Sequence, residues 1–249
     1  MNPYLKHLNK IEFVATLACT GRCKHCSQGD HSSGGEKIDP RVAAEAVEKV
    51  TAAYDIQTVM VFGGEPLLHR EAVFAIMKAA QQRGVPRRQL ITNGCFTAQP
   101  QEIRRVAAEL FDCGVNDLLL SVDAFHQETI PLDVVKEFAR EAQKAGIPLR
   151  LQPAWLVSPE DENPYNRKTR EILEAFSDLG IWESAGNVIF PEGNALRYFS
   201  EYFKESAPEN PYREDPFDVR CLSVSPNGDL LNGNLYRQDV MEILRAYAP

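Results

Sequence analysis

Short apolar runs alternate with longer amphipathic stretches along most of this chain of 249 residues. The short runs are rich in β-branched residues, as buried strands are, and the longer stretches repeat apolar residues at helical spacing. Strand, helix and strand joined by a right-handed crossover build a parallel sheet covered by helices. The alternation therefore predicts an α/β fold. The six predicted strands begin at Ile11, Thr58, Gln89, Asp117, Pro148 and Asn187.

The predicted helix ends agree with this alternation. Four amphipathic stretches are followed by glycine, which readily takes the left-handed conformation that closes a helix. These glycines are Gly84, Gly114, Gly146 and Gly180. Asp39 before Pro40, and Thr129 shortly before Pro131, predict helix starts, because proline is tolerated in the first turn. Six strand–helix units predict an incomplete (β/α)6 barrel, a partial TIM barrel; the alternative is a doubly wound open sheet.

After about residue 205 the alternation stops. The polar, proline-rich stretch around Pro208 is typical of a surface loop. Beyond it, two short strands are predicted around a turn at residues 226–229, followed by a helix from about Gln238. We therefore expect a core of residues 1–207 and a small C-terminal extension of residues 208–249 that caps the barrel mouth.

The composition excludes several partners. With 27 basic and 35 acidic residues the formal charge is −8 and no basic patch is segregated, so we expect no nucleic acid partner. No apolar run approaches the roughly 20 residues that cross a bilayer. The first residues also lack the apolar stretch of a signal peptide. We expect no membrane partner and a cytoplasmic location, where the cysteines would stay reduced.

Three of the six cysteines fall within eight residues, directly after the first predicted strand. They are Cys19, Cys23 and Cys26. Their spacing suits a cubane iron–sulfur cluster in which each thiolate binds a different iron, leaving one iron open. The alternative is a zinc site completed by His25 or His31, since zinc accepts three sulfurs and one nitrogen. A zinc protein would be colourless and stable in air, whereas the cluster should be brown and oxygen-sensitive.

Other chemically distinctive segments follow the later strands. In barrels of this kind the loops after the carboxyl ends of the strands meet at one mouth and carry the chemistry. The segments are Gly63-Gly64-Glu65-Pro66, Thr92-Asn93-Gly94-Cys95, Ser121 to His126, Gln152 and Pro191 to Ala195. We therefore expect these segments to surround the cysteine loop.

With these segments the sequence resembles the radical S-adenosylmethionine (radical SAM) superfamily, from about Ile11 to Ala195. The resemblance rests on CxxxCxxC, GGEP and a polar fourth strand, in that order. It implies an enzyme with one [4Fe-4S] cluster, held by Cys19, Cys23 and Cys26, whose open iron is chelated by S-adenosylmethionine. Reductive cleavage then gives a 5′-deoxyadenosyl radical that abstracts hydrogen from the substrate. The implied electron donor is a protein such as flavodoxin or ferredoxin.

The resemblance also implies cofactor contacts. The family uses GGEP for the amino group of S-adenosylmethionine, which predicts Gly63, Gly64 and Glu65 beside that group. Ser121 and Asp123 lie on one side of the fourth strand and are similar to the family's ribose and carboxylate contacts. The further candidates for cofactor contact are Asn93, Gln152, Asn194 and His25.

Several candidates have alternatives. Asn93 holds a carboxylate or only forms an Asn-Gly turn, and His25 packs on the adenine or ligates a metal. Asn194 stands where many relatives carry arginine. His126 is a candidate to move a proton, or a loop histidine bonded to backbone. Cys95 is a candidate hydrogen donor to a substrate radical, or an inert buried thiol.

The extension begins with Cys221-Leu-Ser-Val-Ser-Pro-Asn-Gly-Asp, which resembles the start of a SPASM-type extension. In relatives that extension carries auxiliary clusters, but here Cys95, Cys113 and Cys221 stand on separate elements, so we predict no auxiliary cluster. As a cap, the extension would exclude water from the radical. The SPASM-like remnant favours a peptide or protein side chain as substrate. The alternatives are a small-molecule metabolite, or a non-catalytic iron–sulfur or zinc protein.

Overall fold

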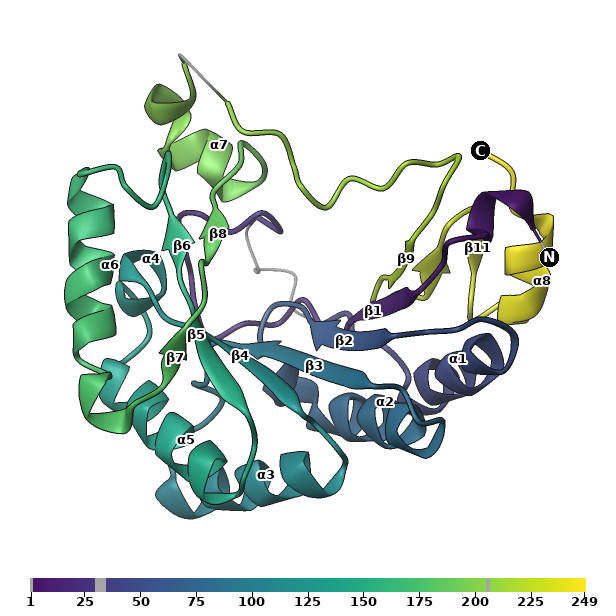
Figure 1. Cartoon of the computed structure of the whole chain (residues 1–249), viewed down its shortest axis with the longest axis horizontal. Helices are drawn as coiled ribbons and strands as arrows, with labels where there is room; N and C mark the ends of the chain where they lie inside the picture. Colours follow the sequence, from purple (N-terminus) through teal and green to yellow (C-terminus); the bar gives the residue numbers. More distant parts are fainter. Residues whose placement is uncertain (1, 30–34, 205–206) are drawn as a thin grey trace.

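The computed structural model describes residues 2–29, 35–204 and 207–249. Within them, one sheet of seven parallel strands carries the fold. In order across the sheet, the strands are β7 (Trp182–Glu183), β5 (Leu149–Gln152), β4 (Asp117–Ser121), β3 (Arg87–Thr92), β2 (Thr58–Phe62), β1 (Lys10–Val14) and β9 (Cys221–Val224). The sheet is a crescent whose edge strands β7 and β9 stand on opposite wings (Figure 1). The predicted incomplete barrel is confirmed.

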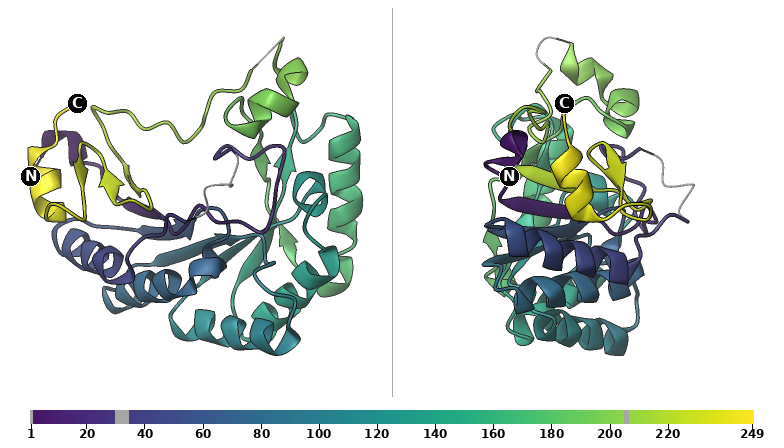
Figure 2. Two further views of the ribbon diagram at one scale, coloured as in Figure 1. Left: turned by 180° about the vertical axis from the view of Figure 1, so that it is seen from behind. Right: turned by 90° about the vertical axis from the view of Figure 1, so that its right-hand side faces the viewer.

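Helices cover the convex face of the crescent (Figures 1 and 2). The longer helices are α1 (Pro40–Ala53), α2 (Arg70–Gln82), α3 (Pro100–Asp112), α5 (Leu132–Lys144) and α6 (Pro164–Glu174), and the shorter ones are α4 (Ala124–Gln127), α7 (Asn194–Tyr198) and α8 (Val240–Ala246). Single turns of 3-10 helix lie at Pro3–Leu5, Pro66–His69, Ser177–Leu179 and Ser200–Phe203. Apolar side chains such as Val47, Met77, Leu110 and Phe138 are fully buried in the core. In the described ranges, no helix combines the length and apolar character needed to span a membrane.

The helix ends largely follow the sequence. Asp39 caps α1, and its carboxylate accepts hydrogen bonds from two backbone N–H groups of the first turn. The four predicted closing glycines, Gly84, Gly114, Gly146 and Gly180, have φ angles of 72°, 93°, 86° and 59°. The helix start predicted near Thr129 and Pro131 is confirmed, but Thr129 is not its cap. Pro131 is the N-cap of α5, and the Thr129 hydroxyl instead accepts a hydrogen bond from the backbone N–H of Arg22.

The sixth predicted strand, from Asn187, is present, but its predicted place in the main sheet is wrong. β8 (Asn187–Val188) pairs with β6 (Ala154–Trp155) in a separate small sheet, and β7 takes the place beside β5. Pro153 lies between β5 and β6 and has no N–H to donate to a ladder. Gly186 has a φ of 75°, and a Cβ there would lie 2.4 Å from the carbonyl oxygen of Pro153. These two residues turn the chain out of the main sheet.

The extension contributes to the main sheet. β9 pairs in parallel with β1, and its side chains Leu222 and Val224 are buried in the core. The predicted turn is confirmed between β9 and β10 (Asp229–Leu230): Gly228 N–H donates to the carbonyl oxygen of Ser225 at 3.0 Å, and Ser225 N–H donates to that of Asp229 at 3.1 Å. β10 also pairs with β11 (Gly233–Asn234) in a short antiparallel hairpin. The sequence did not predict that β9 joins the main sheet beside β1.

Residues 207–220, which we call the strap, cross the open side of the crescent from the α7 wing to β9 (Figures 1 and 2). Near the α7 wing, Asn210 Nδ2 donates to Glu192 Oε1 at 3.0 Å. Near β9, Glu214 Oε2 accepts from the backbone nitrogens of Arg220 at 2.7 Å and Cys221 at 3.1 Å. The strap is therefore tied to both wings.

Candidate active site

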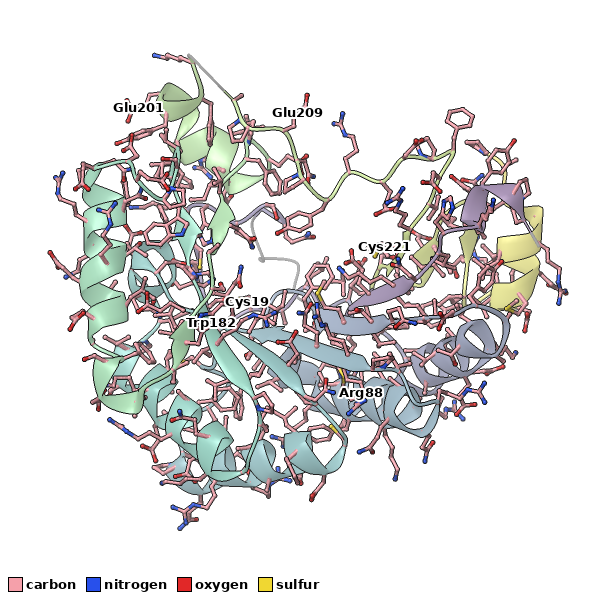
Figure 3. All side chains as sticks on the ribbon, in the orientation of Figure 1. Cys19, Arg88, Trp182, Glu201, Glu209 and Cys221 are labelled. Carbon is pink, nitrogen blue, oxygen red and sulfur yellow. The ribbon has the colours of Figure 1, made fainter. Side chains whose placement is uncertain are left out.

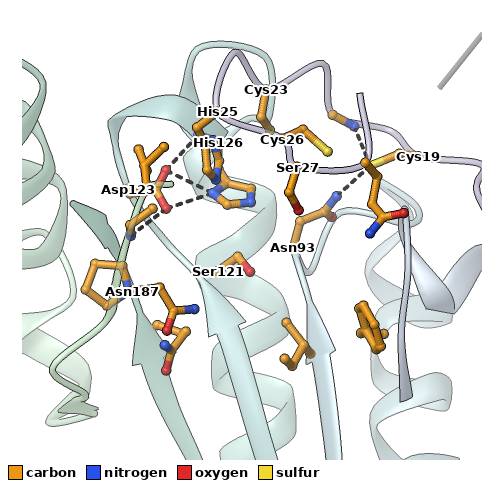
Figure 4. Close-up of a pocket in the computed structure, with 18 of the residues that line it drawn as sticks. Cys19, Cys23, His25, Cys26, Ser27, Asn93, Ser121, Asp123, His126 and Asn187 are labelled. Carbon is orange, nitrogen blue, oxygen red and sulfur yellow. Dashed lines mark hydrogen bonds and ion pairs between the residues drawn. The ribbon is translucent and has the colours of Figure 1, made fainter. Parts of the chain in front are cut away.

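A cavity of about 230 Å³ lies at the carboxyl ends of the strands (Figure 4). It is lined by Cys19, Gly21, Cys23 and residues 25–28 of the cysteine loop; Phe62, Gly63 and Gly64; Ile91, Thr92 and Asn93; Ser121, Asp123 and His126; Gln152, Pro153 and Ala154; residues 187–190; and Tyr212. Loops that are far apart in the sequence therefore share one cavity. Parallel strands place those loops at the same edge of the sheet.

All three clustered cysteines line this cavity, and their thiols form no disulfide. Cys19 Sγ accepts a hydrogen bond from the backbone N–H of Gly21 at 3.3 Å, and Asn93 Nδ2 lies 3.7 Å from it. Burial raises the pKa of Cys19 to about 11, and it raises the pKa of Cys23 as well. The thiols of Cys19 and Cys23 therefore hold their protons until a metal replaces them. Three thiols at one cavity are the donor set that fits a [4Fe-4S] cluster with one open iron.

The two glycines after β2 hold the chain that leads into the cysteine loop. Gly64 N–H donates to the carbonyl oxygen of Thr16 at 2.8 Å, and Glu65 N–H donates to that of Ala18 at 2.7 Å. A Cβ at Gly64 would lie 2.2 Å from the oxygen of Ala18, and one at Gly63 would lie 2.5 Å from the oxygen of Thr16. Any side chain at either position would push this backbone away. The two glycines thus permit their own backbone to pack closely against residues 16–18. They also leave the backbone of residues 63–64 accessible from the cavity.

Glu65 lies behind the cavity wall. Its side chain is fully buried and does not line the cavity. Oε1 accepts hydrogen bonds from Leu67 N–H at 3.0 Å and from the Thr92 hydroxyl at 2.7 Å, and Oε2 accepts from Asn93 N–H at 2.8 Å. Burial raises the pKa of Glu65 to about 7, although these hydrogen bonds act in the opposite direction. The carboxylate therefore joins the loops after β2 and β3 to each other.

Asn93 both lines the cavity and forms a turn. Its Oδ1 accepts from Cys95 N–H at 2.8 Å, and its Nδ2 donates to the Thr20 hydroxyl at 3.1 Å. Gly94 follows with a φ of 73°. Asn93 therefore connects the loop after β3 to the cysteine loop.

Cys95 lies outside the cavity lining, and its partly buried side chain packs against the hydrophobic core.

Asp123 and His126 form a pair at the end of β4 (Figure 4). Asp123 is fully buried; its Oδ1 accepts from the backbone N–H groups of Phe125 and His126, and its Oδ2 accepts from that of Ala154. His126 Nδ1 lies 2.8 Å from Oδ2. Burial by itself would raise the pKa of Asp123, but the charge and hydrogen bonds of His126 outweigh burial and hold it at about 2. Asp123 therefore fixes the orientation of the His126 ring.

His25 lies in the cavity wall between two aromatic neighbours. Its ring centroid is 5.0 Å from that of Phe125 and 4.8 Å from that of His126. Burial, followed by the charge of His126, lowers the pKa of His25 to about 4, so the ring is neutral near pH 7. Its buried Nδ1 has no hydrogen-bond partner among the described residues. His31, the other histidine considered for a zinc site, lies outside the described residues.

Asn194 contacts the cysteine loop and does not line the cavity. Its backbone N–H donates to the carbonyl oxygen of Cys26 at 2.9 Å, and its Nδ2 donates to that of Cys23 at 3.3 Å. Gly193 has a φ of 54°, and a Cβ there would lie 2.4 Å from the carbonyl oxygen of Ser27. This turn therefore holds the far end of the cysteine loop.

Sequence reasoning missed some of the cavity lining. Ser121 and Gln152 line the cavity as the sequence suggested, and Gln152 Oε1 accepts from the Ser184 hydroxyl at 2.7 Å. Asn187 was assigned only to a strand, although a polar residue at a strand end is a signal for a site. Tyr212 comes from the proline-rich strap, where no sequence signal marked it.

The three remaining cysteines lie on different elements. Cys113 follows α3, and its Sγ donates to the carbonyl oxygen of Leu110 at 3.2 Å. Cys221 begins β9, and Figure 3 places it on the β9 wing, away from Cys19 over the middle of the sheet. Together with Cys95 in the loop after β3, these thiols do not meet at one place.

The chain is similar to known proteins over most of its length. The family model of the radical SAM superfamily matches residues 13–192. A probable GTP 3′,8-cyclase of Saccharolobus islandicus is 26% identical over 260 residues, covering 97% of this chain and 75% of the relative. A GTP 3′,8-cyclase of Rhizobium etli is 25% identical over 173 residues, covering 65% of this chain and 47% of the relative.

Solved structures share the fold at low sequence identity. The structure of anSMEcpe with bound AdoMet (S-adenosylmethionine) has a TM-score of 0.62 and 13% identity, and the match covers 96% of this chain and 78% of that one. Streptococcus suis SuiB bound to S-adenosylmethionine has a TM-score of 0.58 and 11% identity, with 97% of this chain and 66% of that one covered.

Proposed function

The chain belongs to the radical SAM superfamily, and on that premise we propose that it abstracts hydrogen from a small-molecule substrate. It is an enzyme whose cofactors are a [4Fe-4S] cluster and S-adenosylmethionine. When bound, the two cofactors together supply the 5′-deoxyadenosyl radical that takes hydrogen from the substrate. The observation that carries the proposal is that the thiols of Cys19, Cys23 and Cys26 line one cavity with the Gly63-Gly64 backbone.

In this proposal the three thiolates hold the cluster, and the loops around them hold the thiolates in place. Gly64, Asn93 and Asn194 each contact the cysteine loop or the chain that leads into it. Because these contacts come from three different loops, they restrain the cysteine loop in addition to any bonds to a cluster. Such pre-organisation lowers the entropy cost of assembling a metal site.

The cavity wall offers polar groups to S-adenosylmethionine. Ser121, Gln152 and Asn93 line the cavity, which supports their proposed contacts with the ribose and carboxylate groups. We propose that Glu65 acts from behind the wall, by positioning the backbone that meets the amino group. Asp123 has both carboxylate oxygens engaged, so we propose that it orients His126.

The remaining candidates keep more modest roles. Movement of a proton by His126 stays a prediction, and so does flavodoxin or ferredoxin as the electron donor. For Cys95 we propose the alternative of an inert thiol, because its side chain packs on the core and lies outside the cavity wall.

Two observations support a small molecule as the substrate. Relatives aligned over 97% of this chain are named GTP 3′,8-cyclases, and GTP is a small molecule. The strap is tied to both wings and crosses the open side of the crescent, so it would obstruct a folded protein. Among the described residues, however, no Lys or Arg lines the cavity, which disfavours a polyanion such as GTP itself.

A related proposal concerns the C-terminal extension, residues 208–249, which the sequence predicts to cap the core of residues 1–207. We propose that the strap is the part of the extension that caps the cavity, since Tyr212 belongs to the cavity lining. Its ring lies 6.1 Å from that of Phe190, another lining residue. The rest of the extension, through β9, completes an edge of the sheet. A peptide or protein side chain as substrate stays a prediction from the SPASM-like remnant.

The test is anaerobic production of 5′-deoxyadenosine by protein reconstituted with iron and sulfide, given S-adenosylmethionine and a strong reductant. The variant with Cys19, Cys23 and Cys26 changed to Ala should give no product above background. The matched control changes Cys95, Cys113 and Cys221 to Ala and should retain production. Product from the first variant would overturn the ligand assignment.

The same assay tests the substrate class. A metabolite ultrafiltrate of a cell extract should increase 5′-deoxyadenosine production, and the retained protein fraction should not. GTP and a mixture of unstructured peptides form two further arms. If only the protein fraction or the peptides stimulate production, the small-molecule proposal is wrong and the peptide prediction stands.

A further inference from the structure

A second set of metal-ligand atoms meets beside the thiol triad. Cys23, His25 and His126 each offer one ligand atom, and these atoms lie within 4.8 Å of one another. In a tetrahedral zinc site with bonds of about 2.0 Å to nitrogen and about 2.3 Å to sulfur, ligand atoms lie about 3.4 Å apart. The three side chains therefore need to approach one another by at most about 1.5 Å. Figure 4 shows them together at one end of the cavity.

The contact between His126 and the Asp123 carboxylate already has the form found at metal sites. His126 Nδ1 is bonded to the buried Asp123 carboxylate, which leaves Nε2 as the free ring nitrogen. A histidine that ligates a metal almost always bonds its other ring nitrogen to a carboxylate or carbonyl, which fixes the ring and raises its basicity. Asp123 is in turn held by three backbone N–H groups. His126 is thus oriented by contacts that need no metal.

His25 provides an independent observation. Its Nδ1 is buried and has no hydrogen-bond partner in the part of the chain that the structure describes. A buried polar atom without a partner is unfavourable, and a ligand that bonds it would relieve the penalty. The ring stands between Phe125 and His126, so its neighbours restrict it to this end of the cavity.

We propose that the chain without its cluster binds one Zn²⁺ through Cys23, His25 and His126. One sulfur and two nitrogens, with water as the fourth ligand, make a donor set that zinc accepts. Cys23 belongs to this site and to the thiol triad, so zinc and the iron–sulfur cluster exclude each other. Cys19 and Cys26 take no part in holding the zinc.

The first test needs no variant. Metal-free protein with reduced thiols is titrated anaerobically with Co²⁺, a spectroscopic substitute for zinc, and then with Zn²⁺. We expect about one equivalent to bind, with tetrahedral d–d bands and a charge-transfer band of the intensity of one thiolate. A band of the intensity of three thiolates would place the metal on the cysteine triad and overturn the proposal.

Two variants separate the zinc site from the cluster site. Cys19→Ser should bind zinc as the wild type does, yet fail to assemble a cluster. His126→Gln should lose at least tenfold in zinc affinity and still assemble a cluster, as measured by iron content and absorbance. His25→Gln should behave as His126→Gln does. Equal loss of zinc affinity in Cys19→Ser, or wild-type affinity in both histidine variants, would contradict the assignment.

Competition provides the last readout. Prior loading with one equivalent of Zn²⁺ should block cluster assembly in the wild type and should not block it in His126→Gln. Assembly that is insensitive to zinc in the wild type would show that the two metals do not share Cys23. These outcomes concern metal binding alone. A chain that binds zinc in this way but never cleaves S-adenosylmethionine would leave this inference standing and defeat the proposed function.

Discussion

Glu65 combines two properties that usually oppose each other in a folded protein. Its carboxylate accepts three hydrogen bonds, which favour the charged form, and it is fully buried, which disfavours that form. Burial prevails, and the pKa rises from 4.5 to about 7. The folded chain therefore holds a proton on Glu65 at pH values where the unfolded chain has released it.

This difference predicts how stability depends on pH. As pH rises from about 4.5 to about 7, the contribution of Glu65 to the free energy of unfolding should fall by at most about 3 kcal/mol. Glu65→Gln has no proton to release and should lack this fall. Urea unfolding of both metal-free proteins at pH 5 and pH 8 measures the effect. A difference between the two proteins that stays constant with pH would show that the Glu65 pKa is not raised.

At this scale the sequence predicted which residues meet at one cavity better than how their side chains are oriented there. The three clustered cysteines, the GGEP segment and Asn93 were all singled out, and all lie at or beside one cavity. The position of Glu65 behind the cavity wall was not predictable, because a motif does not say which way a side chain points. The steric reason for Gly63 and Gly64 was also hidden, since it depends on backbone at residues 16–18 that packs against them.

At the scale of elements, the strap depends on hydrogen bonds near its two ends. Near β9 a single carboxylate, that of Glu214, accepts from two consecutive backbone N–H groups. Hydrogen bonds to a charged group contribute about 1.5 to 3 kcal/mol each. Loss of this carboxylate should therefore free the local segment without unfolding the sheet.

Glu214→Ala should make the strap a better protease substrate. We expect trypsin to cleave after Arg213 at least about tenfold faster than in the wild type, since local opening becomes easier by more than 1.4 kcal/mol. Glu209→Ala, in the same strap and without a carboxylate contact of this kind, is the control and should be cleaved at the wild-type rate. Mass spectrometry of the fragments measures both. Equal cleavage of all three proteins would mean that Glu214 does not hold the strap.

Element types were predictable where periodicity was strong, and partners were less so. The helices α2, α3 and α5 lie close to their predicted positions because apolar spacing and closing glycines agree there, and α1 does so because its apolar spacing agrees with the Asp39 cap. The strand from Asn187 was assigned to the wrong sheet, since Pro153 and Gly186 act together although they are distant in the sequence. β9 was predicted as a strand before the turn at residues 226–229, but not as a strand of the main sheet, because its pairing with β1 depends on a distant segment that periodicity cannot reveal.

At the scale of the whole molecule, the first described residues are held by the last helix. Asn2 is buried, and its Nδ2 donates to the carbonyl oxygens of Leu244 at 2.9 Å and Tyr247 at 2.7 Å. Its Oδ1 accepts from the backbone N–H of Tyr4. One side chain thus joins the two ends of the described chain.

Asn2→Ala should lower the free energy of unfolding by about 2 to 3 kcal/mol, because it removes the side-chain donor from two buried carbonyl groups. For a chain of this size that corresponds to a fall in melting temperature of about 4 to 12 °C. Asn232→Ala, which removes an exposed hydrogen bond to Ala248, is the control and should change stability by about 0.5 kcal/mol or less. Circular dichroism during heating measures both. Equal shifts in the two variants would contradict the role of Asn2.

The pairing of β1 with β9 also sets an order of events during synthesis. The paired residues Lys10 and Cys221 are about 210 positions apart, so at 5 to 20 residues per second the ribosome needs roughly 10 to 40 s to make the second after the first. Throughout that interval β1 has an unpaired edge, and such an edge invites pairing with other chains. The strand that leads into the cysteine loop is therefore made long before the strand that covers its edge, and aggregation of the nascent chain should concentrate at this edge.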